Sequence, residues 1–332
     1  MIGGTRRLHA LRPARGGLRS EKEIKANWSD ADADPAISIC CATYNHAAWI
    51  EDALRGFLAQ ETRYSFEIIV RDDASSDGTR EIVADYAEKY PGLIKAILNK
   101  ENRFGAGERA MWVWPEVARG RYWAFCEGDD FWISRDKLEI QASWMDAHPD
   151  YVFSCHDFYN AEGQLIARPA AMLGEEGEFG SEFGAEAILT RNFVATNTAF
   201  FRSKCFASLP RSQLFMLDWP LWLHLSLCGR CFYHRSLYGC YRDHGQGLWS
   251  GLTFHQRAQR ELQFYDFAAN AYPEERERVE RKKMEYVSRI ILDHQDSLNE
   301  LADLRRNPVK YLARGALRRV LRKAHGRRGP RC

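Results

Sequence analysis

Long apolar runs are absent from this sequence of 332 residues. No stretch approaches the roughly 20 consecutive apolar residues that a helix needs to cross a lipid bilayer. The first 35 residues also lack the apolar core of a secretory signal, and they carry five arginines between positions 6 and 19 instead. We therefore expect no transmembrane helix and a cytoplasmic protein.

Two common kinds of functional motif are missing as well. The segment after the first expected strand lacks the glycine fingerprint of dinucleotide-binding proteins, which argues against a nicotinamide cofactor. Among nine cysteines only Cys228 and Cys231 have motif spacing, and no second pair completes a zinc site. This pair follows an expected helix, whereas a redox motif places its first cysteine at a helix start. We expect reduced, structural cysteines.

Acidic residues are absent from positions 305–332, where eleven lysines and arginines occur. The chain has a net charge of +2, so removing these eleven positive charges leaves −9 for the residues before position 305. Residues 308–323 alternate arginines with apolar side chains at helical spacing, which predicts a basic amphipathic helix. Two interpretations stay open: contact with an anionic membrane surface, or docking of a solvated helix on the acidic body.

The first half of the chain alternates between two kinds of apolar pattern. Residues 1–35 have no apolar periodicity and predict a flexible lead-in. Expected strands cover residues 37–43, 66–71, 93–98 and 122–126. Expected helices cover residues 47–60, 80–89, 106–118 and 134–147. This alternation predicts an α/β fold with a doubly wound, mainly parallel sheet.

The second half changes in character after residue 147. Strands are expected over residues 151–159 and 197–202, a loop over 167–183, and a short helix over 184–190. A helix starts near Asp218, two short strands end at residue 242, and residues 253–305 predict helices. We expect a lead-in (1–35), an α/β domain (36–250, with halves 36–132 and 133–250) and a helical extension (251–332).

Three carboxylates follow the strand over residues 122–126: Glu127, Asp129 and Asp130. In open α/β sheets ligands bind outside the carboxyl ends of the strands, so these side chains occupy a ligand position. Clustered carboxylates repel one another unless a cation joins them, and oxygen ligands suit Mg²⁺ or Mn²⁺. The alternative is a solvated acidic turn before the next helix.

Other candidate residues admit structural explanations. Asp218 precedes an apolar helix with Pro220 near its first turn, a position where aspartate commonly acts as a cap. His244 and Trp249 lie in a glycine-rich loop, and a lone histidine is commonly a satisfied structural group.

Several stretches together resemble family 2 glycosyltransferases. They are residues 38–47 (SICCATYNHA), 67–79 (EIIVRDDASSDGT), 127–132 (EGDDFW), Asp218-Trp219 and 244–249 (HGQGLW). The resemblance covers about residues 37–250, and its second and third stretches in this order are specific. It implies a GT-A fold, in which a Rossmann-like nucleotide-binding sheet has helices on both faces, followed here by an α-helical C-terminal extension. It also implies transfer of a sugar from a nucleotide donor with inversion.

The resemblance places the nucleotide at the ends of the first two strands. It implies that the base and ribose lie against Thr43, Tyr44 and Asn45. It further implies that Asp72 accepts a hydrogen bond from N3–H of a uracil or thymine, with Asp73 in the same pocket.

The resemblance also implies a metal site and a base. Glu127, Asp129 and Asp130 stand at the metal-binding Asp-x-Asp signature, and Asp129 also binds the donor. Glutamate replaces the usual first aspartate, which leaves open whether Glu127 reaches the metal directly or through water. Asp218 occupies the position of the catalytic base, and the loop with His244 and Trp249 closes over donor phosphates and acceptor.

These roles imply a Mn²⁺ or Mg²⁺ cofactor, a UDP- or dTDP-sugar donor, and a glycan or lipid-linked acceptor. They suggest cell-surface polysaccharide or lipopolysaccharide biosynthesis at the cytoplasmic face of the inner membrane, and no nucleic-acid partner. A sugar nucleotidyltransferase is one alternative, although such enzymes carry a Gly-rich basic loop where residues 44–48 read YNHAA. A non-catalytic nucleotide-sugar-binding protein is the other, and the presence of Asp218 argues against it.

Overall fold

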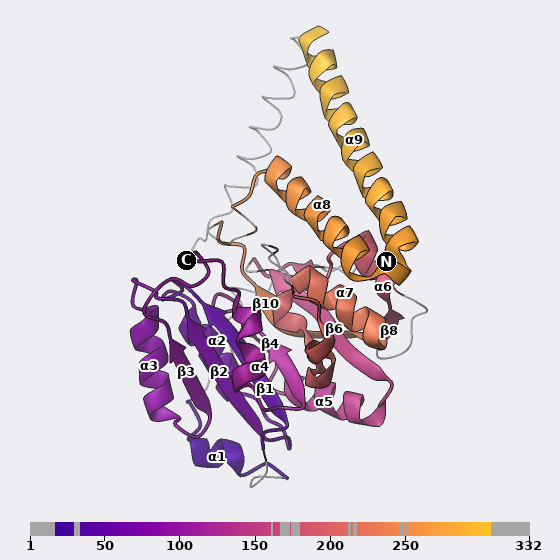
Figure 1. Cartoon of the computed structure of the whole chain (residues 1–332). Coiled ribbons are helices and arrows are strands. Elements are labelled where there is room, and N and C mark those ends of the chain that lie inside the picture. The colour runs from indigo at the N-terminus through magenta and orange to yellow at the C-terminus, as the bar shows by residue number, and fades with distance from the viewer. Residues whose placement is uncertain are drawn as a thin grey trace, which may run out of the picture. The chain divides into compact units, whose positions relative to one another are not determined.

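The computed structural model describes residues 17–29, 34–160, 162–166, 173, 180–211, 214, 218–245, 247, 249 and 251–306 (Figure 1). The chain forms two compact units, Met1–Arg276 and Glu277–Cys332. The domain boundary that we expected after residue 250 stays a prediction. Within the described ranges, no helix is both long and apolar enough to cross a membrane.

Four parallel strands form the first half of the sheet. They are β1 (Ile37–Thr43), β2 (Phe66–Asp72), β3 (Ile94–Leu98) and β4 (Tyr122–Phe125), in the order β3-β2-β1-β4. All residues of β2 and nearly all of β1 are buried, because both faces of these strands are covered. The helices α2 (Ile50–Leu58) and α3 (Thr79–Lys89) follow β1 and β2, which confirms the predicted βα alternation.

The second half extends the sheet along the path β4-β9-β6-β10-β5. Its strands are β5 (Phe131–Trp132), β6 (Tyr151–Asn160), β9 (Phe200–Arg202) and β10 (Arg230–Tyr241), with β7 (Leu165–Ile166) and β8 (Gly180–Phe183) off this path. Strand β9 is antiparallel to both β4 and β6, and β10 is parallel to β6. The carboxyl ends of β1, β2, β4 and β10 therefore lie at one edge of the sheet.

Helices cover both faces of the sheet. On one face, α2, α3 and α5 (Lys137–Ala147) share a core with the inward side chains of β1, β2 and β4, including Ile39, Ile68 and Ala124. On the other face, Trp222 of α7 (Asp218–Cys228) stacks on Phe153 with 5.1 Å between ring centroids. Successive strand residues point to opposite faces, so each face has its own packing layer.

The remaining short elements connect these layers. They are α6 (Ala185–Thr190) and the 3-10 turns η3 (Thr196–Thr198) and η4 (Ser203–Ser208). Helix α8 (Phe254–Ala271) packs on α7, since Phe264 stacks on Trp219 with 4.0 Å between ring centroids. After η5 (Pro273–Glu275), α9 runs over Arg276–Arg306, so the predicted helical character of residues 253–305 is confirmed. The predicted basic helix over residues 308–323 lies outside the described residues.

The predicted helix over residues 106–118 is wrong. The structure has a 3-10 turn η1 (Ala110–Trp112) and a single turn α4 (Trp114–Val117) instead. Proline has no N–H to donate and its ring clashes with the preceding turn, so Pro115 can enter a helix only in its first turn. Helix α4 accordingly begins immediately before Pro115.

Other segments also differ from the prediction. The last four residues of the expected loop over residues 167–183 form strand β8. Residues 17–29 are not merely a flexible lead-in, since α1 (Glu21–Lys25) starts with a capping box and its Ile24 is buried in the main core. The two short strands expected before residue 242 are the single strand β10, whose register shifts beside β6 give the chain its irregular pattern.

Candidate functional site

The loops after β1 and β2 are joined by hydrogen bonds at the carboxyl edge of the sheet. The amide of Asn45 donates to the hydroxyl of Ser75 (2.8 Å), and the amide of Ser76 donates to the Asn45 side chain (2.9 Å). Asn45 has a φ of 54°, in the left-handed region that asparagine tolerates better than most residues. The predicted nucleotide-binding loops thus form one connected structure.

A close backbone approach explains the glycine between the acidic residues. A Cβ at Gly128 would lie 2.5 Å from Oγ1 of Thr43 and 2.9 Å from Cδ1 of Ile50. The Gly128 amide also donates to the Ala42 carbonyl (2.9 Å). The acidic loop therefore lies directly against the end of β1, and this contact requires glycine.

Glu127, Asp129 and Asp130 meet as predicted, with carboxylate oxygens within 4.8 Å of one another. Asp130 is 1% exposed, and its Oδ1 accepts a hydrogen bond from the Arg242 amide (2.8 Å). Its Oδ2 and the Oδ1 of Asp129 are buried and have no hydrogen-bond partner among the described residues. Buried carboxylate oxygens without donors are costly, so this cluster fits a divalent cation.

The raised pKa values of these carboxyl groups also favour a bound cation. Desolvation, followed by the charges of Asp129 and Asp218, raises the pKa of Glu127 to about 8, although this side chain reaches the surface of the site. Burial, followed by the charge of Asp129, raises the pKa of Asp130. Each carboxylate therefore resists the ionisation of the next, and a cation would remove that resistance.

Two histidines contact the same cluster from other loops. His244 Nε2 lies 3.0 Å from Oδ2 of Asp129, and His46 Nε2 lies 3.7 Å from the same atom. Ligand atoms of these three residues also lie within 4.8 Å of one another. The ring of His244 stacks on Trp49 with 4.1 Å between centroids, which fixes its plane. Asp129 thus belongs to an all-carboxylate set and to a mixed imidazole-carboxylate set.

Asp218 lies in the first turn of α7, close enough to the acidic loop for its charge to raise the pKa of Glu127. Its Oδ2 accepts a hydrogen bond from the side-chain amide of Asn192 (2.9 Å). Burial raises the pKa of Asp218, although the Asn192 hydrogen bond opposes this shift. The structure therefore brings Asp218 to the carboxylates, from which it is separated by about 90 residues of sequence.

Asp72 and Asp73 are buried at the end of β2 and bonded within the protein. Asp72 accepts hydrogen bonds from the amide and hydroxyl of Ser75. Asp73 accepts from the side chain of Asn99 (2.8 Å) and from the amides of Arg103 (3.0 Å) and Phe104 (2.9 Å). Asp73 thus fixes the loop after β3, and a donor-binding role for either residue stays a prediction.

The remaining predicted residues lie in different surroundings. Thr43 is buried at the end of β1, whereas Tyr44 is 46% exposed. The guanidinium carbon of Arg257, in α8, lies over the ring of Trp249, 5.7 Å from the ring centroid. A closing movement of the loop with His244 and Trp249 stays a prediction.

Sequence reasoning missed several residues of the site. Trp49 and Asn192 contact His244 and Asp218, respectively, and no motif marked them. Arg242 donates to the Asp130 carboxylate through its amide and to the Asp129 carbonyl through its guanidinium (both 2.8 Å). His46 lies next to Asn45 within residues 38–47, one of the stretches that carry the family resemblance. This position was the sequence signal that could have identified His46 as a site residue.

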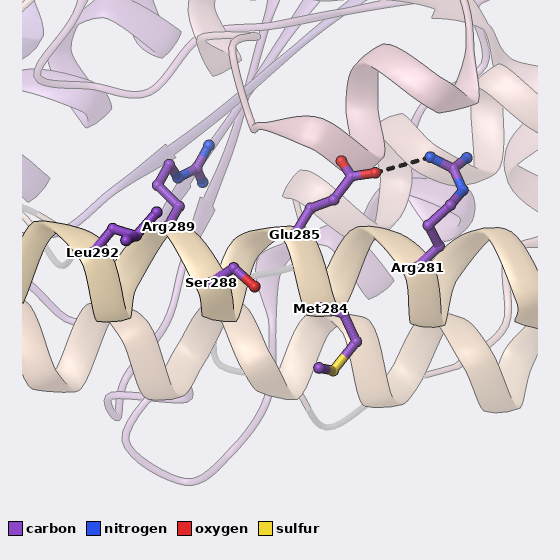
Figure 2. Close-up of a pocket in the computed structure, with 6 residues that line it drawn as sticks. All are labelled: Arg281, Met284, Glu285, Ser288, Arg289 and Leu292. Atoms are coloured by element: carbon purple, nitrogen blue, oxygen red, sulfur yellow. Dashed lines mark hydrogen bonds and ion pairs between the residues drawn. The ribbon is translucent and has the colours of Figure 1, made fainter.

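A separate hollow lies on α9 (Figure 2). Its lining side chains come from one helix, with Arg281 and Glu285 joined by an ion pair of 3.0 Å. None of the residues of the acidic site lines it.

Comparisons with known proteins identify a family and several relatives. The model of the family described as "Glycosyl transferase family 2" matches residues 38–212. An uncharacterized protein from Mycobacterium bovis is 32% identical over 243 residues, which are 70% of this chain and 66% of the relative. The Escherichia coli UDP-Glc:alpha-D-GlcNAc-diphosphoundecaprenol beta-1,3-glucosyltransferase WfgD is 36% identical over 34% of this chain and 42% of its own length. The chain thus spans under two thirds of the length of these relatives.

Two solved structures share the fold. Residues 1–349 of S. aureus TarS, in complex with UDP-GlcNAc, align with a TM-score of 0.56 and 19% identity over 76% of this chain and 71% of that chain. The mannosyltransferase PcManGT from Pyrobaculum calidifontis, in complex with GDP-Man and Mn²⁺, aligns with a TM-score of 0.53 and 17% identity over 84% of this chain and 86% of that chain.

Proposed function

The chain belongs to glycosyl transferase family 2, and we propose that it transfers a sugar from a nucleoside diphosphate donor to a hydroxyl acceptor with inversion. The observation that carries this proposal is that a cluster of three carboxylates and a separate fourth carboxylate come together at one edge of the sheet. Glu127, Asp129 and Asp130 form a cluster that would bind a cation, and Asp218 approaches it from α7. A metal-assisted transfer with a separate base needs both.

The proposed base is Asp218. An acceptor hydroxyl has too high a pKa to attack unaided, and a positioned carboxylate that takes its proton contributes typically ~10²–10⁴-fold. The Asn192 amide donates to one oxygen of Asp218 and so orients the carboxylate that would take the acceptor proton. A single attack on the face opposite the leaving group gives inversion.

The proposed metal is Mn²⁺ or Mg²⁺. Bound there, the ion would neutralise negative charge on the departing diphosphate as a Lewis acid. Glu127, Asp129 and Asp130 would hold it through oxygen, which suits either ion, whereas His46, Asp129 and His244 would favour Mn²⁺ over Mg²⁺. Mn²⁺ in the PcManGT complex supports a metal in this fold.

The proposed donor is a UDP- or dTDP-sugar, bound between the joined loops after β1 and β2, with Thr43, Tyr44, Asn45, Asp72 and Asp73 as its nucleoside contacts. UDP-GlcNAc in the TarS complex and UDP-Glc in the name of WfgD support this choice. The name of WfgD also supports a lipid-linked glycan acceptor and cell-surface polysaccharide biosynthesis.

We further propose that the protein acts at the cytoplasmic face of the membrane. The eleven basic residues of positions 305–332 would attract anionic lipid, each by about 1 kcal/mol at most. A chain ending at residue 305 should lose salt-sensitive co-sedimentation with anionic vesicles. Equal sedimentation of both chains would favour docking of this segment on the acidic body.

A screen of nucleotide sugars tests the central proposal. Thermal shift with Mn²⁺ should identify a stabilising donor, and that donor should be hydrolysed or transferred faster with Mn²⁺ than with a chelator. The configuration of the product at the anomeric carbon, measured by NMR, tests inversion. Donor binding without turnover in any metal would support the alternative of a nucleotide-sugar-binding protein. Pyrophosphate-dependent conversion of a sugar nucleotide into a nucleoside triphosphate and a sugar 1-phosphate would support a nucleotidyltransferase.

A further inference from the structure

A thiol cluster lies at the end of α7 that is remote from Asp218. Cys228 is the last residue of the helix, and its Sγ lies 3.4 Å from Nε2 of His224, one turn earlier. Cys205 lies in η4, and its carbonyl oxygen lies 2.8 Å from the same Nε2 atom of His224, so both cysteines meet at this imidazole. Neither cysteine has a part in sugar transfer, and the sequence analysis predicted reduced, structural cysteines at these positions.

The partners of His224 determine which of its nitrogens carries a hydrogen. Nε2 lies 2.8 Å from the Cys205 carbonyl oxygen, which can only accept, so Nε2 is the donor. Nδ1 lies 3.0 Å from the hydroxyl of Tyr272, which can donate to it. An N–H therefore lies beside the Cys228 sulfur, and such a donor stabilises a thiolate.

The charge state of Cys228 follows from these contacts. Hydrogen bonds from Cys205 first, and then from His224 and Ser208, lower the pKa of Cys228 to about 4. The carbonyl dipoles at the end of α7 oppose an anion there, so the stabilisation comes from side chains. Cys228 is exposed and Cys205 is buried, so an oxidant in solvent reaches Cys228 first.

We propose that Cys228 and Cys205 form a reversible disulfide, in which Cys228 reacts with a hydroperoxide and Cys205 resolves the product. The Cys228 thiolate attacks the terminal peroxide oxygen and the O–O bond breaks. A sulfenic acid forms, and the departing alkoxide takes a proton from solvent and leaves as an alcohol, or as water when the oxidant is hydrogen peroxide. The Cys205 sulfur then attacks the sulfenic sulfur, forming the S–S bond and releasing water with the thiol proton. Two thiols lose two electrons, which the peroxide gains, and a dithiol reductant reverses the step.

The cross-link would connect η4 to the end of α7 and close the segment 205–228. This segment contains Asp218, the proposed base. Oxidation would therefore restrain the part of the chain that carries Asp218, while the chemistry of the thiol pair itself does not depend on sugar transfer.

Peptide mapping of the full-length protein tests the proposal. The reduced chain is treated with hydrogen peroxide, remaining thiols are blocked with N-ethylmaleimide, and a non-reducing digest is analysed by mass spectrometry. We expect the Cys205 peptide joined to the Cys228 peptide in most molecules, and separate peptides after dithiothreitol. Recovery of Cys228 as the maleimide adduct, or joined to Cys231 or to a second chain, would overturn the proposal.

Two variants test the order of reaction. Cys205→Ser should leave a sulfenic acid at Cys228 that dimedone captures, whereas Cys228→Ser should leave Cys205 unmodified. Cys231→Ala is the matched control, because Cys231 is buried three residues away and this variant should retain the cross-link. The rate at which Cys228 of the wild type is alkylated should change less than twofold between pH 6 and 8. The alkylation rate of an ordinary thiol rises about tenfold per pH unit in this range. An ordinary profile, or equal dimedone labelling of both cysteines, would contradict the assigned roles.

Discussion

At the scale of single residues, Asp218 and Glu127 are carboxylates with different partners. Asp218 is held by Asn192, whereas Glu127 lies among like charges. Asp218→Asn should lower kcat by two orders of magnitude or more and leave the Kd for donor and Mn²⁺ near wild type, because a base acts only in the transition state. Single-turnover kinetics and donor titration measure the two quantities.

The structural alternative for Asp218 predicts a different result. Loss of a helix cap costs about 0.5–2 kcal/mol of stability and leaves the folded molecules active. Asn192→Ala is a useful companion, since it removes the hydrogen bond but keeps the carboxylate. A near-normal rate per folded molecule in Asp218→Asn would assign Asp218 to the cap.

Glu127 makes metal binding dependent on protons. Its pKa of about 8 means that the carboxyl is mainly protonated at pH 7, and a cation must displace this proton. Mn²⁺ affinity should therefore rise as pH increases from 6 towards 8, with a release of protons at pH 7 to which Glu127 contributes. Calorimetry in buffers of different ionisation enthalpy measures that release.

Glu127→Gln is the matched variant for this prediction. Glutamine has the same shape and no proton to release, so the number of protons released on metal binding should fall and the pH dependence should weaken. Unchanged proton release in Glu127→Gln would show that another group titrates on metal binding.

At the scale of elements, strand ends could be predicted and contacts between loops could not. The apolar runs of β1, β2 and β4 stop at polar residues. This change in polarity predicted both the positions of the strands and the position of the acidic residues that follow β4. The contact between His46 and Asp129 joins loops 83 residues apart, and local pattern carries no signal for such a pair. The helix expected over residues 106–118 failed because apolar spacing outweighed Pro115 in that prediction.

Asp73 offers a test of how one carboxylate holds a loop. It accepts from the amides of Arg103 and Phe104, and hydrogen bonds to a charged group contribute about 1.5–3 kcal/mol. Asp73→Asn should raise the hydrogen-exchange rates of these two amides about 10- to 100-fold. Asp85→Asn, an exposed position on α3, should leave them unchanged.

If both amides keep their wild-type exchange rates in Asp73→Asn, the loop after β3 is held by other contacts. Donor affinity in the same variant then decides whether Asp73 acts on the nucleotide as well, as the family resemblance implies.

At the scale of the whole molecule, the sequence predicted the α/β architecture because βα repeats leave few alternative topologies. The separation into units at residue 276 was not predicted, since helical patterns run on both sides of that position. A buried lysine also escaped prediction: Lys137 is 0% exposed, with Nζ donating to Gln141 Oε1 (2.6 Å) and lying 4.3 Å from the ring centroid of Trp132. Its position in α5 reads as an ordinary solvent-facing charge.

Lys137 should make global stability depend on pH. Burial lowers its pKa to about 7, whereas an unfolded lysine titrates near 10.4. Between these values the native state binds fewer protons than the unfolded state, so this group favours folding increasingly as pH rises. The free energy of unfolding of the wild type, relative to that of Lys137→Met, should therefore rise by up to about 1.4 kcal/mol per pH unit above pH 7. Below pH 7 the difference between the two proteins should be constant.

Urea unfolding of both proteins at pH 6, 7, 8 and 9 measures this difference. Loss of the Nζ hydrogen bond to Gln141 adds an offset that does not vary with pH, and other titrating groups are common to both proteins. Lys95→Met, at an exposed position of β3, is the control. Its free energy of unfolding should differ from that of the wild type by the same amount at all four pH values. If the Lys137→Met difference is also constant up to pH 9, Lys137 keeps its charge in the folded core, and the surrounding aromatic and amide groups must then stabilise a buried ammonium ion.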